Sequence, residues 1–232
     1  MRKLTLKSIL AYADTDDKRQ LKQAVTLAEK LQARLKLVDV LEPGQLRGFM
    51  FSSVGLADLV RAARQKRLAE LAARLSTPAL KVRAELLEGQ AHEALIREAV
   101  GRGHSLVMVN LAEGAARRTS STGMRLLRKC PCPVWVAGLK PLKRKVRVLA
   151  AVDTVAEDEA RASLNAKVLA AAQSVAQLCG GELHVLTAWH AYGEGMLRGP
   201  YFSLGRPRGK ESALRLARVI NTAKQAWESS AA

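Results

Sequence analysis

Apolar runs and amphipathic segments alternate regularly along the first part of the chain. The apolar runs are rich in Leu, Val and Ile and end at polar or turn-forming residues, which is typical of buried strands. They lie at residues 6–13, 35–41, 80–87, 106–109 and 134–137. The segments between them carry apolar residues at helical spacing and predict helices. These helices lie at residues 21–31, 56–75, 91–100 and 122–129.

The longest of these predicted helices has an apolar stripe along one side. We expect the stripe to form the inner face of the helix, with Leu59, Ala63, Leu68, Leu71 and Leu75 as its members. The helix ends before Pro78, because a proline disfavours helical backbone in the residue that precedes it.

Five strands that alternate with four helices predict an α/β fold, in which helices cover both faces of a parallel sheet. We expect a flavodoxin-like sheet with strand order 3-2-1-4-5. In this order the carboxyl ends of strands one and four border a crevice, where such sheets commonly bind ligands. The search for a site therefore begins at the ends of the runs 6–13 and 106–109.

The chain then repeats its own beginning. The sequence ILAYADT at 9–15 returns as VLAAVDT at 148–154, which is 139 residues later. Each copy is followed by an amphipathic helix and a second strand, as expected of a tandem duplication. We therefore expect a complete domain at 1–139, a basic linker at 140–145 and a partial second copy of the domain at 146–232.

The second copy has no counterparts of strands three to five. A loop rich in Gly, Pro and Arg leads to residue 209, and an apolar stripe then predicts a helix at 211–227. We expect residues 196–209 to be poorly ordered and the helix to dock on an apolar surface. A sheet of two strands leaves an open edge and an uncovered face, so we also expect a homodimer.

The chain is strongly basic, with a formal net charge of +17. Such a charge attracts polyanions, but 24 Lys and Arg against 13 Asp and Glu up to residue 138, and 14 against 8 after it, spread it over both parts. Aromatic residues make up 4% of the sequence, which does not favour a stacking platform for single-stranded nucleic acid. We expect solvated basic faces and no nucleic-acid partner.

Targeting and redox signals point to a cytoplasmic protein that does not bind a membrane. No apolar run approaches the length of a membrane-spanning helix, and the first residues lack the pattern of a secretory signal. The three cysteines are too few for a disulfide framework, and a bridge between Cys130 and Cys132 would strain the backbone. We expect buried, reduced thiols and no metal site, because no second ligand pair accompanies them.

Several segments together resemble the universal stress protein family, in particular its tandem-domain E type. The resemblance covers about residues 7–202. Its carriers are Asp14, Asp153, GQAHEALI at 89–96, GHSLV at 103–107 and, most specifically, LLRKCPCPVW at 126–135. It implies the adenine nucleotide alpha hydrolase-like version of the flavodoxin-like fold, and pairing of two copies through the last strand of the domain.

Nucleotide-binding members of the family carry a loop of the form Gly-x-x-Gly-(nine residues)-Gly-Ser/Thr after strand four, whose backbone holds phosphates. This chain departs from that motif, because Asn110 and Ser120 stand where glycines are expected and only Gly114 lies inside the shorter loop. Glu113 adds a negative charge. The resemblance still assigns a candidate nucleotide site to Asp14, Val38, Asn110, Arg117, Ser120, Ser121 and Thr122.

Two interpretations of this loop stay open. The Ser and Thr cluster caps the following helix while the arginines are solvated, or these groups hold a nucleotide such as ATP. No catalytic motif is present, and His92 and His104, which flank one predicted helix, are expected to be satisfied by nearby backbone groups. We therefore expect a stress-response protein that is not an enzyme, requires no cofactor, and acts through dimerisation and binding of a small molecule or protein. The alternative is an ATP-binding or other nucleotide-binding stress regulator with at most slow hydrolysis.

Overall fold

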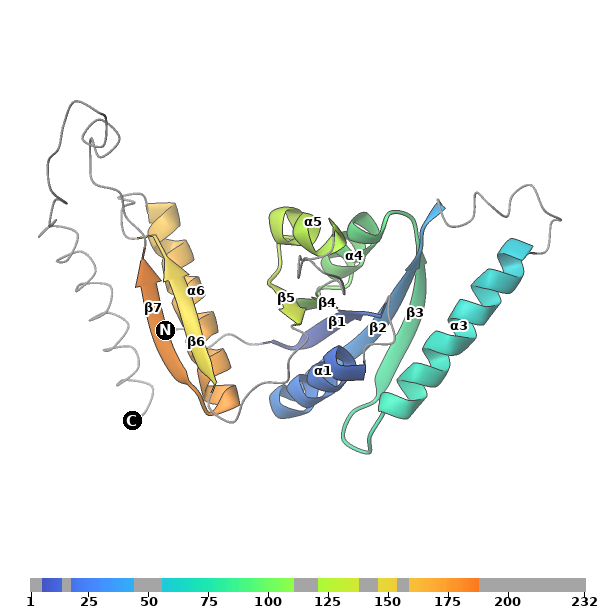
Figure 1. The fold of residues 1–232 in the computed structure, drawn as a ribbon, viewed down its shortest axis with the longest axis horizontal. Helices are drawn as coiled ribbons and strands as arrows, with labels where there is room; N and C mark the ends of the chain where they lie inside the picture. Colours follow the sequence, from blue (N-terminus) through green and yellow to red (C-terminus); the bar gives the residue numbers. More distant parts are fainter. Residues whose placement is uncertain are drawn as a thin grey trace, which may run out of the picture. The chain divides into compact units, whose positions relative to one another are not determined.

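The computed structural model describes residues 6–13, 18–43, 56–110, 121–137, 146–153 and 159–187. The chain divides into two compact units (Figure 1). The first unit is Thr5–Pro141, and the second is Leu142–Ala232 together with Met1–Leu4. The segment expected to be poorly ordered, at 196–209, and the helix expected at 211–227 lie outside the described residues.

The first unit is a five-stranded parallel sheet in the order β3-β2-β1-β4-β5, as the sequence predicts. Its elements alternate between strand and helix. They are β1 (Ser8–Tyr12), α1 (Lys18–Leu31), β2 (Arg34–Leu41), α3 (Leu56–Leu75), β3 (Val82–Glu88), α4 (Ala91–Gly101), β4 (Leu106–Asn110), α5 (Ser121–Lys129) and β5 (Val134–Ala137). Since β1 lies between β2 and β4, the ends of the strands that were expected to border a crevice are neighbours.

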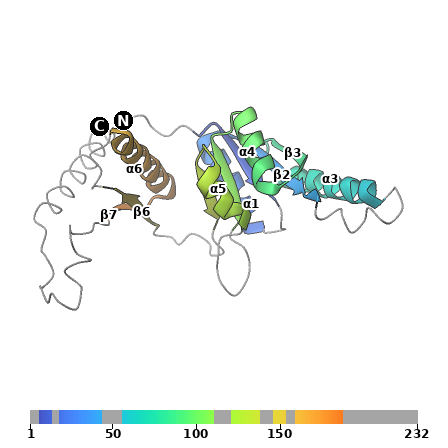
Figure 2. The same ribbon diagram turned by 90° about the horizontal axis from the view of Figure 1, so that it is seen from above.

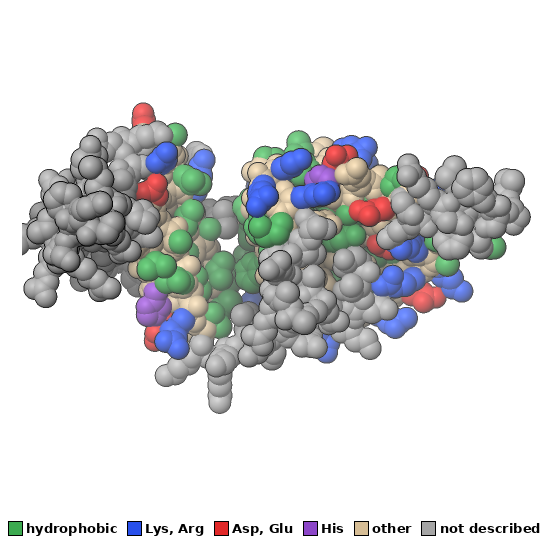
Figure 3. All heavy atoms as spheres, turned by 45° about the horizontal axis from the view of Figure 1, so that its top comes forward, with side chains coloured by type: hydrophobic (Ala, Val, Ile, Leu, Met, Phe, Trp, Pro, Cys, Tyr) green, Lys and Arg blue, Asp and Glu red, His purple; other side chains and the backbone are tan. Residues whose placement is uncertain are grey.

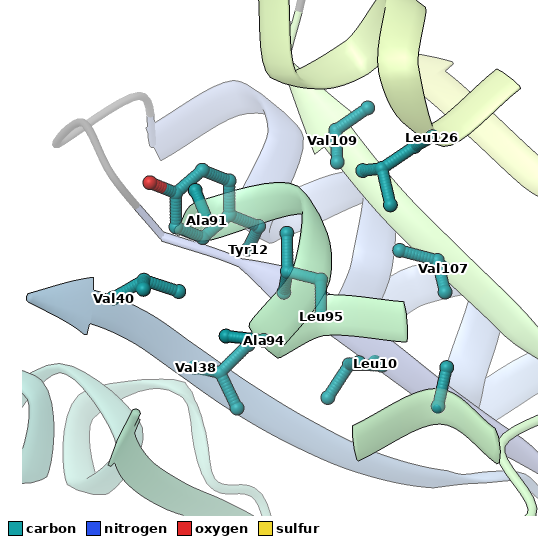
Figure 4. Close-up of a cluster of buried hydrophobic side chains, with 11 residues drawn as sticks. Leu10, Tyr12, Val38, Val40, Ala91, Ala94, Leu95, Val107, Val109 and Leu126 are labelled. Carbon is teal, nitrogen blue, oxygen red and sulfur yellow. The ribbon is translucent and has the colours of Figure 1, made fainter. Parts of the chain in front are cut away.

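The core beneath α4 explains why the central strands read as continuous apolar runs. Side chains from β1, β2 and β4 meet α4 and α5 on one face of the sheet, as Figure 4 shows. This cluster consists of Leu10, Tyr12, Val38, Val40, Ala91, Ala94, Leu95, Ala99, Val107, Val109 and Leu126. Because helices cover both faces, residues of either parity along these strands are buried.

The inner face of α3 differs from the expected stripe. Leu68 and Ala72 are buried, but Leu59 is 66% exposed and Ala63 is also exposed. The helix has 20 residues and β3 has 7, so α3 is longer than the strand it covers. Figure 2 shows α3 beside β3, which is an edge strand of the sheet. The prediction of Leu59 and Ala63 as inner residues is therefore wrong.

The second unit repeats the first strand, helix and strand of the first unit. Its elements are β6 (Arg147–Val152), α6 (Glu159–Cys179) and β7 (Glu182–Thr187), and β6 pairs with β7 in parallel. Ala150, Val152 and Leu169 form its small core, with Leu183 and Val185 packed against them. Of the residues that the structure describes in both units, no helix is long and apolar enough to cross a membrane.

Candidate functional site

The two described strand residues of the predicted site, Val38 and Asn110, lie beside the carboxyl end of β1. Tyr12 ends β1 and pairs with Val38 of β2, and Asn110 ends β4 opposite Ala137 of β5. Asn110 is 9% exposed. The sheet thus brings Val38 and Asn110 to the same edge from opposite sides of β1, which is where a ligand would lie in a sheet of this order.

Val38 is part of the packed core as well as of this edge. Its side chain lies beside Ala94 under α4 (Figure 4), and it has no exposed surface. Its backbone oxygen accepts a hydrogen bond of 2.8 Å from the N–H of Ala13. This bond holds the chain as it leaves β1, one residue before Asp14.

The remaining predicted residues divide into those that the structure describes and those that it does not. Asp14, Arg117 and Ser120 lie outside the described residues. Ser121 is the first residue of α5, and Thr122, in the same first turn, is half-buried. The start of α5 therefore follows the candidate phosphate loop directly, with the polarity of a helix N-terminus that favours anions.

A buried glutamine at the same edge was not predicted from the sequence. Gln20 of α1 is 1% exposed, and its Nε2 donates a hydrogen bond of 3.2 Å to the backbone oxygen of Tyr12. Gln20 Oε1 is buried without a hydrogen-bond partner among the described atoms. The available signal was a polar residue beside Leu21, next to the apolar stripe of the helix.

The second unit shows how an aspartate is held at the equivalent strand end. Asn165 of α6 bonds both backbone groups of Asp153: its Nδ2 donates to the oxygen at 2.6 Å, and its Oδ1 accepts from the N–H at 3.1 Å. Arg161 lies 3.4 Å from the carboxylate of Asp153. In the first unit the amide of Gln20 bonds Tyr12 instead, so a side-chain amide from the following helix contacts the end of the first strand in both units.

A second polar cluster joins β2, β3 and α4 to the residues at the amino-terminal ends of β1 and β4. Lys36 of β2 donates hydrogen bonds of 2.5 Å to Glu85 of β3 and to Glu98 of α4. His104 Nδ1 lies 2.7 Å from the hydroxyl of Ser8, and its Nε2 lies 3.7 Å from Glu98. Five elements or loops thus meet around one charged centre that the sequence pattern did not reveal.

The pKa values in this cluster follow from burial and pairing. Burial alone lowers the pKa of Lys36, but its hydrogen bonds to Glu85 and Glu98 outweigh burial and raise it. Burial alone raises the pKa of Glu98, but Lys36 outweighs burial and lowers it. Burial lowers the pKa of His104 despite the nearby Glu98. At neutral pH the cluster therefore holds an ammonium between carboxylates beside a neutral imidazole.

The order Ser8, His104, Glu98 resembles the arrangement of a hydrolytic triad. Ser8 is however only 3% exposed, and the His104 side chain is nearly as well buried. A nucleophile must reach its substrate, so this geometry orients and stabilises the interior rather than attacking an external bond. The described residues also contain no group of three His, Cys, Asp or Glu side chains that could hold a metal ion.

Comparison with known proteins gives a consistent result. The model of the universal stress protein family matches residues 7–138. Universal stress protein E of Escherichia coli (strain K12) is 32% identical over 102 residues, which cover 42% of this chain and 32% of that protein. The chain thus spans about a third of the length of the curated relatives it matches.

A solved structure supports the fold alone. The functionally unknown protein PA1789 from Pseudomonas aeruginosa PAO1 matches 98% of this chain and 70% of its own, with 21% identity and a TM-score of 0.58. The family match extends from the start of β1 past the end of β5, over the whole sheet that forms the candidate site. The chain belongs to the universal stress protein family.

Proposed function

We propose that this stress-response protein acts by binding, first of all to a second copy of itself, and that it is not an enzyme. The observation that carries the proposal is a set of exposed apolar side chains on the uncovered face of the β6–β7 sheet. Leu149 and Leu186 on this face are 61% and 50% exposed. Ala151 pairs with Leu186 and is also exposed. Hydrophobic side chains lie at the surface of this unit in Figure 3.

In the first unit, the residues that correspond to this face are buried. Leu149 and Ala151 correspond to Leu10 and Tyr12, which are 0% and 8% exposed beneath α4. Leu186 corresponds to Val38 through the shared register of the two strand pairs. Side chains that the first unit buries under a helix are thus open in the second, and adjacent exposed apolar groups of this kind commonly mark an interaction surface.

A second copy is the occupant we propose, because the face is self-complementary in chemistry. It presents aliphatic groups together with His184, which pairs with Leu149, and it carries Arg147 and Glu182 as opposite charges at paired positions. Two such faces related by a two-fold axis place apolar groups against apolar groups and let each arginine approach the other copy's glutamate. The open edge of β5 is a second contact that the family resemblance favours, since no described strand pairs with its outer side.

Sedimentation with matched variants tests the dimer. We expect the protein to be dimeric at micromolar concentrations and the double variant Leu149→Asp, Leu186→Asp to be monomeric, because four carboxylates would meet in the interface. Leu59→Asp, at an equally exposed leucine of the first unit, serves as the control and should leave the dimer intact. A wild-type protein that stays monomeric throughout this range would contradict the proposal. If the double variant still dimerised, the result would indicate that the two copies meet at the edge of β5 instead.

Nucleotide binding is the second candidate function. It is favoured by the placement of Asn110 and Thr122 on the two elements that flank the candidate loop. The sequence of that loop argues against tight binding, because a side chain at 110 or 120 hinders the close approach of backbone N–H groups to phosphates. We expect calorimetric titration with Mg-ATP to show weak binding or none. A low-micromolar affinity for Mg-ATP that is lost in Asp14→Ala would instead favour a nucleotide-binding stress regulator.

A further inference from the structure

Two cysteines lie in close contact at the junction of α5 and β5. The Sγ atoms of Cys130 and Cys132 are 3.2 Å apart, although the chain carries no disulfide there. Only Pro131 separates the two residues, and the backbone bends at 131 and 132. An extended segment would hold the sulfurs apart and a bridge would strain it, as the sequence led us to expect, but the bend already brings the two sulfurs together.

Hydrogen bonds fix the chain on both sides of this bend. The N–H of Cys130 donates to the oxygen of Leu126 at 2.8 Å, which ties it to the last turn of α5. The oxygen of Pro133 accepts from the N–H of Val107 at 3.0 Å, which ties the other side to β4. Both thiols also pack against the core beneath α4 and α5. The short sulfur distance is therefore a feature of a well-anchored segment.

Both cysteines are half-buried residues. Burial, followed by the contact with Cys130, raises the pKa of Cys132 to about 12. Cys132 is thus a thiol at neutral pH and a poor first nucleophile, since the thiolate is the reactive form. Cys130 is the better candidate for the first attack, with Cys132 placed to react with its product.

We propose that Cys130 and Cys132 form a redox modification site, in which hydrogen peroxide converts the two thiols to an intramolecular disulfide. In the first step the Cys130 sulfur attacks the peroxide O–O bond, which gives a sulfenic acid and one water molecule. In the second step the Cys132 sulfur attacks the Cys130 sulfur, and the departing hydroxide takes the Cys132 proton to form a second water molecule. Two thiols and one peroxide thus give one disulfide and two water molecules, and an external thiol reverses the change.

The site differs from a structural or metal-binding cysteine pair. Two thiolates alone do not complete a zinc site, and no third ligand joins them among the described side chains. A pair that served only to fill the core would not need a sulfur–sulfur distance of 3.2 Å across a bend anchored on both sides. The location just before β5 also means that oxidation would restrain the edge strand that begins at Val134.

Peptide mapping of the full-length protein tests the proposal. Protein treated with hydrogen peroxide and then alkylated should contain the 130–132 peptide with two hydrogen atoms fewer and no alkyl group, and a reducing thiol should restore both alkylation sites. Cys132→Ser should stop at a sulfenic acid on Cys130, which a dione probe captures. Cys179→Ser, at a cysteine of the second unit, is the matched control and should form the disulfide as the wild type does.

Three results would overturn the proposal. The wild-type peptide would remain fully alkylated after peroxide treatment, or it would carry only sulfinic acid, or its disulfide would join two chains instead of Cys130 and Cys132. Cys130→Ser adds a check on the order of the steps. Burial, the largest cause of the raised pKa of Cys132, persists in this variant, so Cys132 should react more slowly with peroxide than Cys130 does in Cys132→Ser. Equal rates in the two variants would contradict the assignment of Cys130 as the attacking residue.

Discussion

The segments β1–α1–β2 of the first unit and β6–α6–β7 of the second share their local structure and differ in what covers them. In the first, Arg34 N–H donates to the oxygen of Lys7 at 3.0 Å, and in the second Glu182 N–H donates to the oxygen of Val146 at 2.9 Å. The turns after α1 and α6 match as well, with bonds of 2.8 Å from Ala33 to Ala28 and from Gly181 to Ala176. The local sequence alone therefore reproduces the unit down to single hydrogen bonds.

The second face of each sheet shows what the local sequence does not determine. In β1 every residue is buried, whereas in β6 buried and open residues alternate. The difference arises because α4 and α5 pack on the first sheet, while the second sheet meets only α6 in the described structure. An apolar pattern therefore predicts a strand, but whether its side chains are buried depends on the elements that pack against the strand.

The largest effect is expected from the pair Leu10 and Leu149. Leu10→Ala should destabilise the first unit by about 2–5 kcal/mol, because it opens a cavity at a side chain with no exposed surface. Leu149→Ala should change the stability of the second unit by less than about 0.5 kcal/mol in dilute monomer. Hydrogen exchange of the β1 and β6 amides gives a separate value for each unit. Equal costs in dilute protein would mean that Leu149 is already buried within one chain.

The next effect concerns Lys36 and His184. They are counterparts because Lys36 pairs with Leu10 and His184 pairs with Leu149 in the two sheets. Lys36→Met should cost the first unit about 2–4 kcal/mol, because it leaves the Glu98 carboxylate, which is 11% exposed, without its cation. His184 lies 3.6 Å from Glu182 on an exposed strand face, so His184→Met should be almost neutral in dilute monomer. Hydrogen exchange of the β2 and β7 amides measures the loss of stability in each unit. A neutral result for Lys36→Met would show that water replaces the ammonium and that the cluster is open.

Gly181 and Ala33 occupy the same place before the second strand of each unit. A Cβ atom on Gly181 would lie 2.4 Å from the backbone oxygen of Val146, so Gly181→Ala should destabilise the second unit by about 1–3 kcal/mol. Ala33 already carries that Cβ in the first unit, where it is buried. Ala33→Gly is the matched control and should cost about 1 kcal/mol. A harmless Gly181→Ala would show that the two turns are less rigid than their shared hydrogen bonds suggest.

Acidification should weaken the first unit through its buried cluster. The lowered pKa of His104 means that the unfolded chain binds a proton first as the pH falls below about 6.5, so stability falls with the pH. The lowered pKa of Glu98 adds to this loss at lower pH, because its stabilising effect is present above the unfolded pKa and disappears as the pH falls through the folded one. Urea unfolding followed by Trp135 fluorescence, with Trp189 and Trp227 replaced by Phe, measures the effect. His104→Gln should remove the loss near neutral pH, and an unchanged profile would contradict the assignment.

The smallest effect involves the residue that directly follows α1 in the first unit and α6 in the second. Gln32 has a φ of 52° and Gly180 has a φ of 60°, so both adopt the left-handed conformation in which a side chain is strained. Gln32→Gly should stabilise the first unit by up to about 1 kcal/mol, and Gly180→Ala should destabilise the second by a similar amount. Thermal unfolding of both variants checks the opposite signs. Two changes of the same sign would show that neighbouring contacts outweigh the backbone conformation.

The sequence predicted the strands and helices because apolar runs and helical spacing are local signals, and their alternation then led us to the observed sheet order. It placed Leu59 on the inner face of α3, because periodicity does not reveal that the helix is longer than its strand. The Lys36, Glu98 and His104 cluster joins residues far apart in the chain, and Gln20 gave only a weak signal beside Leu21. The resemblance named Val38 and Asn110, which do share one edge, while the roles of the seven predicted site residues remain predictions.

Photo-crosslinking from the exposed face of β6 tests the proposed contact most directly. A benzoylphenylalanine placed at position 149 should form links between two copies, and mass spectrometry should locate them on β6 or β7 of the other copy. The same probe at position 59, which is also exposed, should give no such links. Links that join position 149 only to residues of its own chain, or no links at micromolar concentration, would contradict a dimer through this face.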